Sequence, residues 1–306
     1  MKKYVYPKLS KYDIGCVRLG GGGLGNLLFI FARSIVLAEK INSQIIWPTW
    51  PSIKVGPWIR REKDKRFYGD LFKNDGTYIA GAKKMKYLLF NHKVKVDITD
   101  NKPLPSIPQN GIYVYSAFKM HFDELISYRE IIRSKLLTIT RKKNLLAFYH
   151  DFTHEINVHV RLGDFAKAEP SQFNTERVNT RLPINWYVQV INDIKSIVGD
   201  EKVTFNIFSD GTDEELKPIL SIAGTRRIFF GNALADIFAL SESKLIIASA
   251  SSFSLWARYL GNSSCITFSN QLYENICTNP DGFEFCYGFD EKMPDEIKEK
   301  IRLMYV

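Results

Sequence analysis

The stretch Glu155–Phe165, EINVHVRLGDF, decides the fold of this chain. Its first six residues alternate polar and apolar side chains, which predicts a short strand. The alternation ends in charged and titratable groups, at His159, Arg161 and Asp164. Ligands of open α/β sheets bind at the carboxyl ends of strands, near the point where the strand order reverses. Arg161 would present there a planar, permanently charged group suited to phosphate or carboxylate. From these residues alone, a salt bridge between Arg161 and Asp164 is the alternative interpretation.

Outward from this stretch, predicted strands and helices alternate to the end of the chain. Strands separated by helices of about 8–15 residues are typical of parallel strands with crossover helices, so we predict a doubly wound sheet. Polar residues follow several strands, among them Asp210 and the serines of 249–252, although Asp210 and Ser252 could simply cap the next helix. The expected strands are 155–160, 203–208, 226–229, 244–248 and 265–268, and the expected helices are 184–198, 212–222, 233–241, 252–260 and 294–304.

The first half contains a glycine-rich turn, GGGGLGN, at residues 20–26. We expect a strand at 14–19 before it and an apolar helix at 27–40 after it, the start of a nucleotide-binding α/β unit. The spacing matches GxGxxG, but a dinucleotide site also needs a carboxylate after the second strand, 44–47, and Pro-Thr-Trp follows there. A dehydrogenase is therefore disfavoured. The glycines do offer N–H groups at a helix N-terminus, which is a site for anions. Weaker patterns predict strands at 87–90, 94–98 and 112–115 and a helix at 121–137.

Length and charge favour two domains, 1–150 and 151–306. The chain has 306 residues and a net charge of +9. Residues 1–150 carry 27 Lys and Arg against 11 Asp and Glu, a charge of +16, and residues 151–306 carry 15 against 22, a charge of −7. No nucleic-acid-binding signature accompanies the basic half, so we expect no nucleic-acid partner. An anionic membrane surface or an acidic, lipid-linked substrate fits this half, and a merely solvated basic surface is the alternative.

Targeting and metal-binding patterns are missing from the sequence. The first residues lack the apolar segment of a signal peptide, and no apolar run approaches the ~20 residues of a membrane span. The four cysteines form no CxxC pair, so we expect reduced thiols and a cytoplasmic protein. His150 and His154 have helical spacing, but a metal site there is disfavoured because we expect the pair to lie on the loop or helix before the strand at 155–160.

Four segments resemble motifs of a known enzyme group. HVRLGD at 159–164 resembles the HxRRxD motif of α1,2-, α1,6- and protein O-fucosyltransferases. GGGLGNLLF at 21–29 is similar to the GGLGNQLF motif of the bacterial α1,2-fucosyltransferases, glycosyltransferase family eleven. FSDG at 208–211 resembles that family's FSDD, and 235–261 resembles its third motif, with an SSxFSWWAA-like core. The segments occur in the family's order and span most of the chain.

The resemblance implies an α/β GT-B fold, in which two Rossmann-like domains face a cleft. Residues 1–150 would form the acceptor side and residues 151–306 the domain that binds the donor nucleotide. The donor would be GDP-fucose, with Arg161 on its β-phosphate. The other expected donor-binding residues are His159 and Asp210 for the guanosine, Ser251, Ser252 and Phe253 for the diphosphate side, and Gly23, Gly25 and Asn26 from the first domain. Metal-dependent glycosyltransferases commonly use a D-x-D pair, which this sequence lacks, so we expect neither metal nor other cofactor.

The expected reaction is an inverting transfer of L-fucose to a glycan hydroxyl, the 2-OH of galactose, in surface polysaccharide (O-antigen, lipopolysaccharide) synthesis. Arg161 and Asp164 are the expected catalytic residues, with Asp164 as general base. Arg177 and Arg181, in the polar loop 165–183, are placed to meet the acceptor, which a lipid could carry at the inner membrane face. The alternative for this loop is a plain insertion.

The sequence departs from the family pattern at four positions. Leu162 replaces the second Arg of HxRR, Gly211 replaces the second Asp of FSDD, and Leu27 replaces the Gln of GNQLF. Ala257 or Arg258 stands at a Trp of the third motif. A same-fold transferase with another nucleotide sugar therefore stays open, as does a non-catalytic nucleotide-sugar or glycan-binding protein.

Overall fold

The computed structural model describes residues 2–54, 56–59, 66–98, 103–163, 165, 180–199, 202–272, 274–289 and 291–305. The chain divides into two compact units, residues 1–144 and 145–306. The division falls six residues before the boundary expected at residue 150. The short 3-10 helix η5 (Leu146–Tyr149), with its buried Ala147, packs against helix α7 (Ala233–Ser241) and so belongs to the second unit. The acceptor and donor roles expected of the two domains stay predictions.

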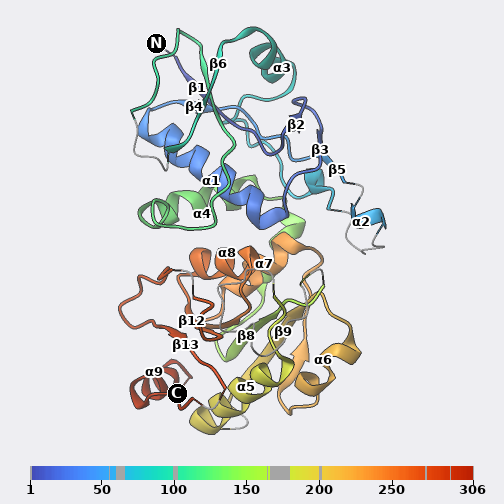
Figure 1. Cartoon of the computed structure of the whole chain (residues 1–306), viewed down its shortest axis with the longest axis vertical. Helices are drawn as coiled ribbons and strands as arrows, with labels where there is room; N and C mark the ends of the chain where they lie inside the picture. Colours follow the sequence, from blue (N-terminus) through green and yellow to red (C-terminus); the bar gives the residue numbers. More distant parts are fainter. Residues whose placement is uncertain are drawn as a thin grey trace. The chain divides into compact units, whose positions relative to one another are not determined.

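The first unit is built on a parallel sheet of four strands in the order β4-β1-β7-β6. Helix α1 packs on this sheet and buries most of its side chains, because its sequence is almost continuously apolar. Figure 1 shows this unit in blue to green. Its sheet strands are β1 (Tyr4–Pro7), β4 (Gln44–Ile45), β6 (Lys93–Val96) and β7 (Ile112–Tyr115), and its helices are α1 (Leu24–Lys40), α2 (Gly56–Ile59), α3 (Gly81–Phe90) and α4 (Arg129–Ile139), with 3-10 turns at Tyr68–Asp70, Ile126–Tyr128 and Lys142–Asn144.

The strand expected at 14–19 is mostly wrong. Its last two residues form β3 (Arg18–Leu19), which belongs to a separate small sheet with β2 (Tyr12–Asp13) and β5 (Ser52–Ile53). The main sheet instead begins with β1, so the chain makes a small hairpin before it reaches the glycine-rich turn. The expected strand at 87–90 is also wrong, since those residues end helix α3.

The second unit contains a parallel sheet of six strands in the order β10-β9-β8-β11-β12-β13. The chain proceeds from β8 to one side through β9 and β10, and then returns to β11 on the other side. The strand order therefore reverses between β8 and β11, where α/β folds bind ligands. The strands are β8 (Glu155–Val160), β9 (Thr204–Ser209), β10 (Thr225–Arg227), β11 (Leu245–Ala248), β12 (Ser264–Thr267) and β13 (Glu284–Cys286).

Helices cover both faces of this sheet, as Figure 1 shows. The apolar residues of β8 share a core with helices α5, α6 and α9 on one face. The alternate residues of β8, Asn157 and His159, face α7 and α8 on the other. The helices, besides α7, are α5 (Ile184–Val198), α6 (Asp213–Leu220), α8 (Ser252–Gly261) and α9 (Asp295–Tyr305). The predicted doubly wound sheet is present, and β13 is a strand that the sequence pattern missed.

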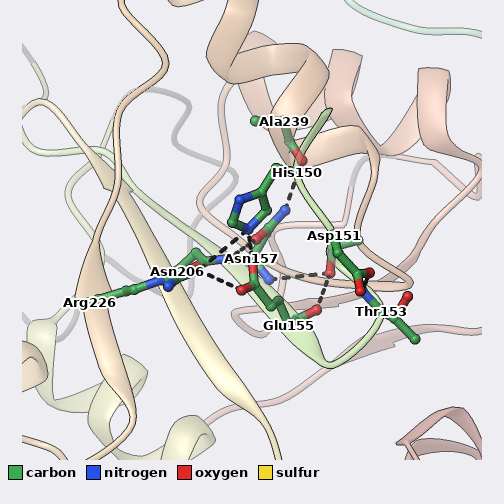
Figure 2. Close-up of polar contacts among 9 residues, drawn as sticks. His150, Asp151, Thr153, Glu155, Asn157, Asn206, Arg226 and Ala239 are labelled. Atoms are coloured by element: carbon green, nitrogen blue, oxygen red, sulfur yellow. Dashed lines mark hydrogen bonds and ion pairs between the residues drawn. The ribbon is translucent and has the colours of Figure 1, made fainter. Parts of the chain in front are cut away.

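A polar network fills the amino-terminal part of this sheet (Figure 2). The Glu155 carboxylate accepts hydrogen bonds from Arg226 Nη2 at 2.5 Å and Asn206 Nδ2 at 2.6 Å, and lies 2.7 Å from His150 Nε2. Asn157 extends the network by donating to the carbonyl oxygen of Ala239 in α7. His150 therefore pairs with Glu155, and the network ties the start of the second unit to three of its strands.

The described helices include none with both the length and the apolarity that a bilayer crossing requires.

Candidate functional site

Arg161 lies directly after β8, at the carboxyl edge of the second sheet. Its guanidinium Nη1 is 2.5 Å from Oδ2 of Asp210, which follows the neighbouring strand β9. The guanidinium also lies over the ring of Phe165, 5.3 Å from its centroid. About a quarter of the Arg161 side chain is exposed, so the charge remains accessible to a ligand. The expected partner Asp164 lies outside the described residues, and the pair that the structure shows is Arg161 with Asp210.

Two glycines let the loops after β8 and β9 pack tightly together. A Cβ atom on Gly163 would lie 2.0 Å from Oδ2 of Asp210, and one on Gly211 would lie 2.4 Å from Cδ1 of Leu162. The backbone N–H of Leu162 donates to Oδ1 of Asp210 at 2.8 Å. Asp210 therefore does not cap the next helix. It binds the loop after β8 and holds Arg161, while Thr212 caps α6.

His159 is buried beneath this edge and carries no charge at neutral pH. Its Nδ1 lies 2.5 Å from Oγ of Ser254 and 2.9 Å from Oγ of Ser249, and its ring stacks on Phe253 at a centroid distance of 4.8 Å. Burial, and then the charge of Arg161, lower the pKa of His159 to about 3. The side chain therefore offers a neutral, hydrogen-bonding surface next to the fixed positive charge of Arg161.

Helix α8 begins beside His159, after β11. Ser251 is its N-cap and accepts a hydrogen bond from the backbone N–H of Ser254 at 3.3 Å, so Ser252 is not the cap. Ser252 and Phe253 are partly exposed at the first turn. Within the described part of the chain, the Ser252 hydroxyl has no hydrogen-bond partner. Because the N-terminus of α8 carries partial positive charge, this turn and Arg161 together suit an anionic ligand.

Arg181 forms hydrogen bonds with the segment that follows Arg161. Its guanidinium donates to the carbonyl oxygens of Phe165 and Gly163, each at 3.0 Å, and to Oε1 of Glu215 at 3.0 Å. These contacts engage all three of its nitrogen atoms. The expected role of Arg181 in meeting an acceptor stays a prediction. Arg177 lies outside the described residues.

The glycine-rich turn of the first unit is held from beneath by two cations. Arg18, which is fully buried, donates from Nη1 to the carbonyl oxygen of Gly20 at 2.6 Å and from Nε to that of Thr49 at 3.0 Å. Lys54 Nζ donates to the carbonyl oxygen of Gly22 at 2.5 Å. Gly20 and Gly21 have positive φ angles, a conformation that favours glycine. The pattern of the sequence did not single out Arg18 or Lys54.

Helix α1 begins directly after this turn. Gly23 is its N-cap and provides no side-chain cap. Gly25 is buried in the first turn of the helix, and the Asn26 side chain packs over Gly22, where a Cβ atom would lie 2.8 Å from the Asn26 Cβ. The helix dipole makes this terminus electropositive. The turn therefore offers backbone donors to an anion, with Asn26 beside them.

The structure thus brings Arg161, Asp210, His159 and the α8 N-terminus together at one edge of the second sheet. Gly23, Gly25 and Asn26 meet at one turn of the first unit. The side chain that sequence reasoning missed in the second unit is Ser254, whose signal is its place one helical turn after Ser251. Among the described residues, no group of three or more His, Cys, Asp or Glu side chains is arranged to hold a metal ion.

Solved structures that this chain resembles include fucosyltransferases. Fucosyltransferase NodZ from Bradyrhizobium aligns with a TM-score of 0.55 at 15% identity, over 88% of this chain and 96% of that chain. POFUT1 in complex with GDP aligns with a TM-score of 0.52 at 12% identity, over 88% and 98%. A variant of Arabidopsis thaliana FUT1 in complex with GDP gives 0.51 at 13% identity, over 92% and 72%. At such identities the likeness establishes the fold alone, and the expected α/β GT-B fold is confirmed.

Sequence comparison gives the family. No curated protein matches the chain significantly. The model of "Glycosyl transferase family 11" matches residues 100–278, which include Arg161, Asp210 and the start of α8 but not the glycine-rich turn. Since this match covers more than half of the 306 residues and agrees with the motifs and the fold, the chain belongs to glycosyl transferase family 11.

Proposed function

We propose that this protein is an inverting fucosyltransferase that moves L-fucose from GDP-fucose to a hydroxyl group of a glycan acceptor. The observation that carries the proposal is the Arg161–Asp210 pair beside the α8 N-terminus, at the point where the strand order reverses. One of the NodZ structures was soaked with GDP-fucose and the POFUT1 structure contains GDP, which supports the choice of donor.

Arg161 would act on the leaving group. In an inverting transfer the acceptor oxygen attacks the anomeric carbon opposite GDP, and negative charge develops on the departing diphosphate. A guanidinium that is already oriented by Asp210 stabilises that charge without reorganisation during the reaction. Ser252, whose hydroxyl has no hydrogen-bond partner among the described residues, would bind the same diphosphate together with the α8 N-terminus, with Ser251 and Phe253 on that side. We expect no metal in this scheme.

The guanosine of the donor would contact His159 and Asp210. Uncharged His159 avoids placing a second cation beside Arg161, since its pKa lies well below neutral pH. The Asp210 carboxylate already bonds Arg161 and the Leu162 N–H, so a contact with guanosine would use its remaining lone pairs. Gly23, Gly25 and Asn26 would bind the donor from the first unit.

The four departures from the family motifs lie in the protein interior. Leu162 is 4% exposed and fills the space above Gly211, and Leu27 is 1% exposed. Buried Arg258 forms an ion pair with Glu284 of β13 at 2.5 Å. Because these side chains pack against protein, they change the core beneath the site and leave its exposed groups in place. The departures are therefore compatible with GDP-fucose as the donor.

We propose that the acceptor group is the 2-OH of a galactose in a surface polysaccharide such as O-antigen, assembled on a lipid at the cytoplasmic face of the membrane. Asp164 is the proposed general base for its hydroxyl. It follows Gly163 directly, and Gly163 contacts Asp210, so Asp164 is close in sequence to the leaving-group site.

A ligand screen tests the donor. Thermal-shift measurements with GDP-fucose, GDP-mannose, UDP-sugars, dTDP-sugars and NAD should show the largest stabilisation with GDP-fucose, because bound ligand adds to the free energy of unfolding. Arg161→Ala should remove that shift, and Arg141→Ala, a change of an exposed arginine elsewhere, should keep it. A transfer assay with galactosides then separates an enzyme from a non-catalytic binding protein. Preference for a non-guanosine nucleotide would defeat the proposal.

A further inference from the structure

The small sheet β2–β3–β5 has apolar side chains on its exposed face and polar side chains on its buried face. Tyr12 pairs with Leu19, and Leu19 pairs with Ile53, so these three side chains stand side by side across the sheet. They are 62%, 53% and 55% exposed, respectively. Ile14, two residues after Tyr12, is 65% exposed and extends the patch along the chain. We call these four residues the outer face. A contiguous apolar surface of this kind marks a place of interaction, unlike single exposed apolar residues.

The buried, inner face of this small sheet is polar because its side chains bind backbone and side-chain groups inside the first unit. Arg18 and Ser52, the alternate residues of β3 and β5, are buried, and Arg18 holds the glycine-rich turn. Ser52 donates to the carbonyl oxygen of Arg66, and Asp13 of β2 accepts from the hydroxyl of Tyr6. Since side chains of a strand alternate between faces, a polar inner face leaves Tyr12, Leu19 and Ile53 outside. The alternation of side chains decides which residues point outward, but it does not require them to be apolar. Exposed polar residues would fit these positions equally well, so the apolar side chains call for a separate explanation.

Positive charge lies next to the outer face, on Lys11 and on the neighbouring helix α3. The Nζ of Lys11 lies 5.5 Å from the ring centroid of Tyr12. Helix α3 packs against the β2–β3 turn, since a Cβ atom on Gly15 would lie 2.8 Å from Sδ of Met85. This helix presents Lys83 and Lys86 to solvent, and residues 76–96 contain five Lys and no Asp or Glu. A second copy of the first unit would bring like charge to like, because residues 1–150 carry +16. The occupant should therefore be anionic and apolar together.

We infer that the outer face docks on an anionic lipid bilayer. Tyr, Leu and Ile side chains insert into the boundary between headgroups and acyl chains, while nearby lysines bind the anionic headgroups. The inference deepens the proposed function, because a lipid-linked acceptor would be met at that surface. Leu19 directly precedes the glycine-rich turn, so docking would place the membrane next to the turn that we propose to bind the donor.

Vesicle co-sedimentation of the full chain tests the docking. The wild-type protein should bind phosphatidylcholine vesicles that contain phosphatidylglycerol, bind pure phosphatidylcholine weakly, and lose binding as salt screens the charges. The combined variant Tyr12→Ser, Leu19→Ser, Ile53→Ser should bind at least about tenfold more weakly, given the apolar area removed. Lys83→Glu with Lys86→Glu should lose at least about fivefold, and only on the anionic vesicles.

The matched control is Phe229→Ser with Leu303→Ser in the second unit, where the two side chains are 68% and 70% exposed. This control should bind vesicles like the wild type, and circular dichroism should show all variants folded. The inference would be overturned if the wild-type protein did not bind anionic vesicles, or if the triple-serine variant bound them as strongly as the wild type. A wild-type dimer that the triple-serine variant converts to a monomer would assign the face to a second copy instead. Thermal shifts with GDP-fucose in the absence of vesicles report separately on the proposed function.

Discussion

The two regions that we propose to bind the donor are built in opposite ways. At the edge of the second sheet the binding groups are side chains, such as Arg161, and helix α8 is capped by the Ser251 hydroxyl. At the glycine-rich turn of the first unit the binding groups are backbone N–H groups, and helix α1 begins at Gly23 without a side-chain cap. Its important side chains, above all Arg18, lie beneath the turn and hold its carbonyl groups.

The difference teaches where substitutions should act. In the second unit, loss of one ligand-facing side chain should reduce catalysis and leave the fold nearly intact. In the first unit, the comparable loss is that of a buried support, so stability and binding should fall together. The following four tests are ordered from the largest expected effect to the smallest.

Arg161→Ala should lower kcat/KM by about 10²–10³-fold, the usual effect of removing one group that stabilises developing charge. The melting temperature should change little, because Arg161 and Asp210 are both partly exposed. Steady-state transfer kinetics measure the effect, with Arg141→Ala as the exposed-arginine control. Activity within a few-fold of the wild type would show that the leaving group is bound elsewhere.

Arg18→Met should lower the free energy of unfolding by about 2–3 kcal/mol, because the carbonyl groups of Gly20 and Thr49 lose a charged donor in the interior. The KM for the donor should rise in the same variant, since the turn is no longer held. Urea unfolding measures the stability, and Lys86→Met, an exposed change in the same unit, should stay within about 0.5 kcal/mol. If Arg18→Met proved as mild as Lys86→Met, the turn would not depend on its buried support.

The buried His159 should make stability depend on pH. Its pKa is about 6.5 in the unfolded chain and about 3 in the fold, so its contribution is complete above pH 6.5 and is lost as the pH falls. The loss amounts to about 1.4 kcal/mol per pH unit. Burial raises the pKa of Asp236 to about 7, which acts in the opposite direction between about pH 4 and 6.5. The two contributions therefore oppose each other in the wild-type curve.

The His159 contribution is obtained by subtracting the stability curve of His159→Gln from that of the wild type. This difference should decrease as the pH falls from 6.5 to 5, and Asp236→Asn should steepen the wild-type curve. Parallel curves for wild type and His159→Gln would mean that His159 has the same pKa in the fold as in the unfolded chain.

Substitutions at the N-caps of helices α1 and α8 should have the smallest effects on stability. Ser251→Ala should lower stability by about 1 kcal/mol, because the N–H of Ser254 loses its acceptor. Gly23→Ser should raise it by a few tenths of a kcal/mol, since the new hydroxyl could accept from the N–H of Asn26. The added Cβ meets no atom within 4 Å. Donor affinity should fall several-fold in Gly23→Ser, because that N–H is then occupied, and unchanged affinity would remove this N–H from the donor site.

The sequence predicted the second unit well because its helices and strands have distinct periods. The expected helices 184–198 and 233–241 coincide with α5 and α7. The alternation of strands and helices was also enough to predict that the polar residues after the strands lie at the carboxyl edge of the sheet. The partner of Arg161 did not follow, because Asp210 lies 49 residues away and only packing through two glycines brings the loops together.

The first unit was harder to predict because its elements are short and their patterns ambiguous. The run YLLF at 87–90 has strand-like composition, yet Leu88 contacts the β2–β3 turn as part of a helix. The strand β1, YVYP, is buried but only four residues long and follows a basic start. The residues 14–19 resemble a strand because they are mostly apolar, whereas only Arg18 and Leu19 form a strand and residues 14–17 make the turn before it.

The packing of Gly163 on Asp210 and of Leu162 on Gly211 has a consequence for how this sequence can change. Each side chain occupies the volume that a Cβ on the opposing glycine would need, so the two loops form one interlocked unit. In the motifs that this chain resembles, Arg and Asp stand at the positions of Leu162 and Gly211. Restoring either one alone would place a charge, or a clash, in a buried contact. The family residues should therefore be restored at these two positions together and not singly.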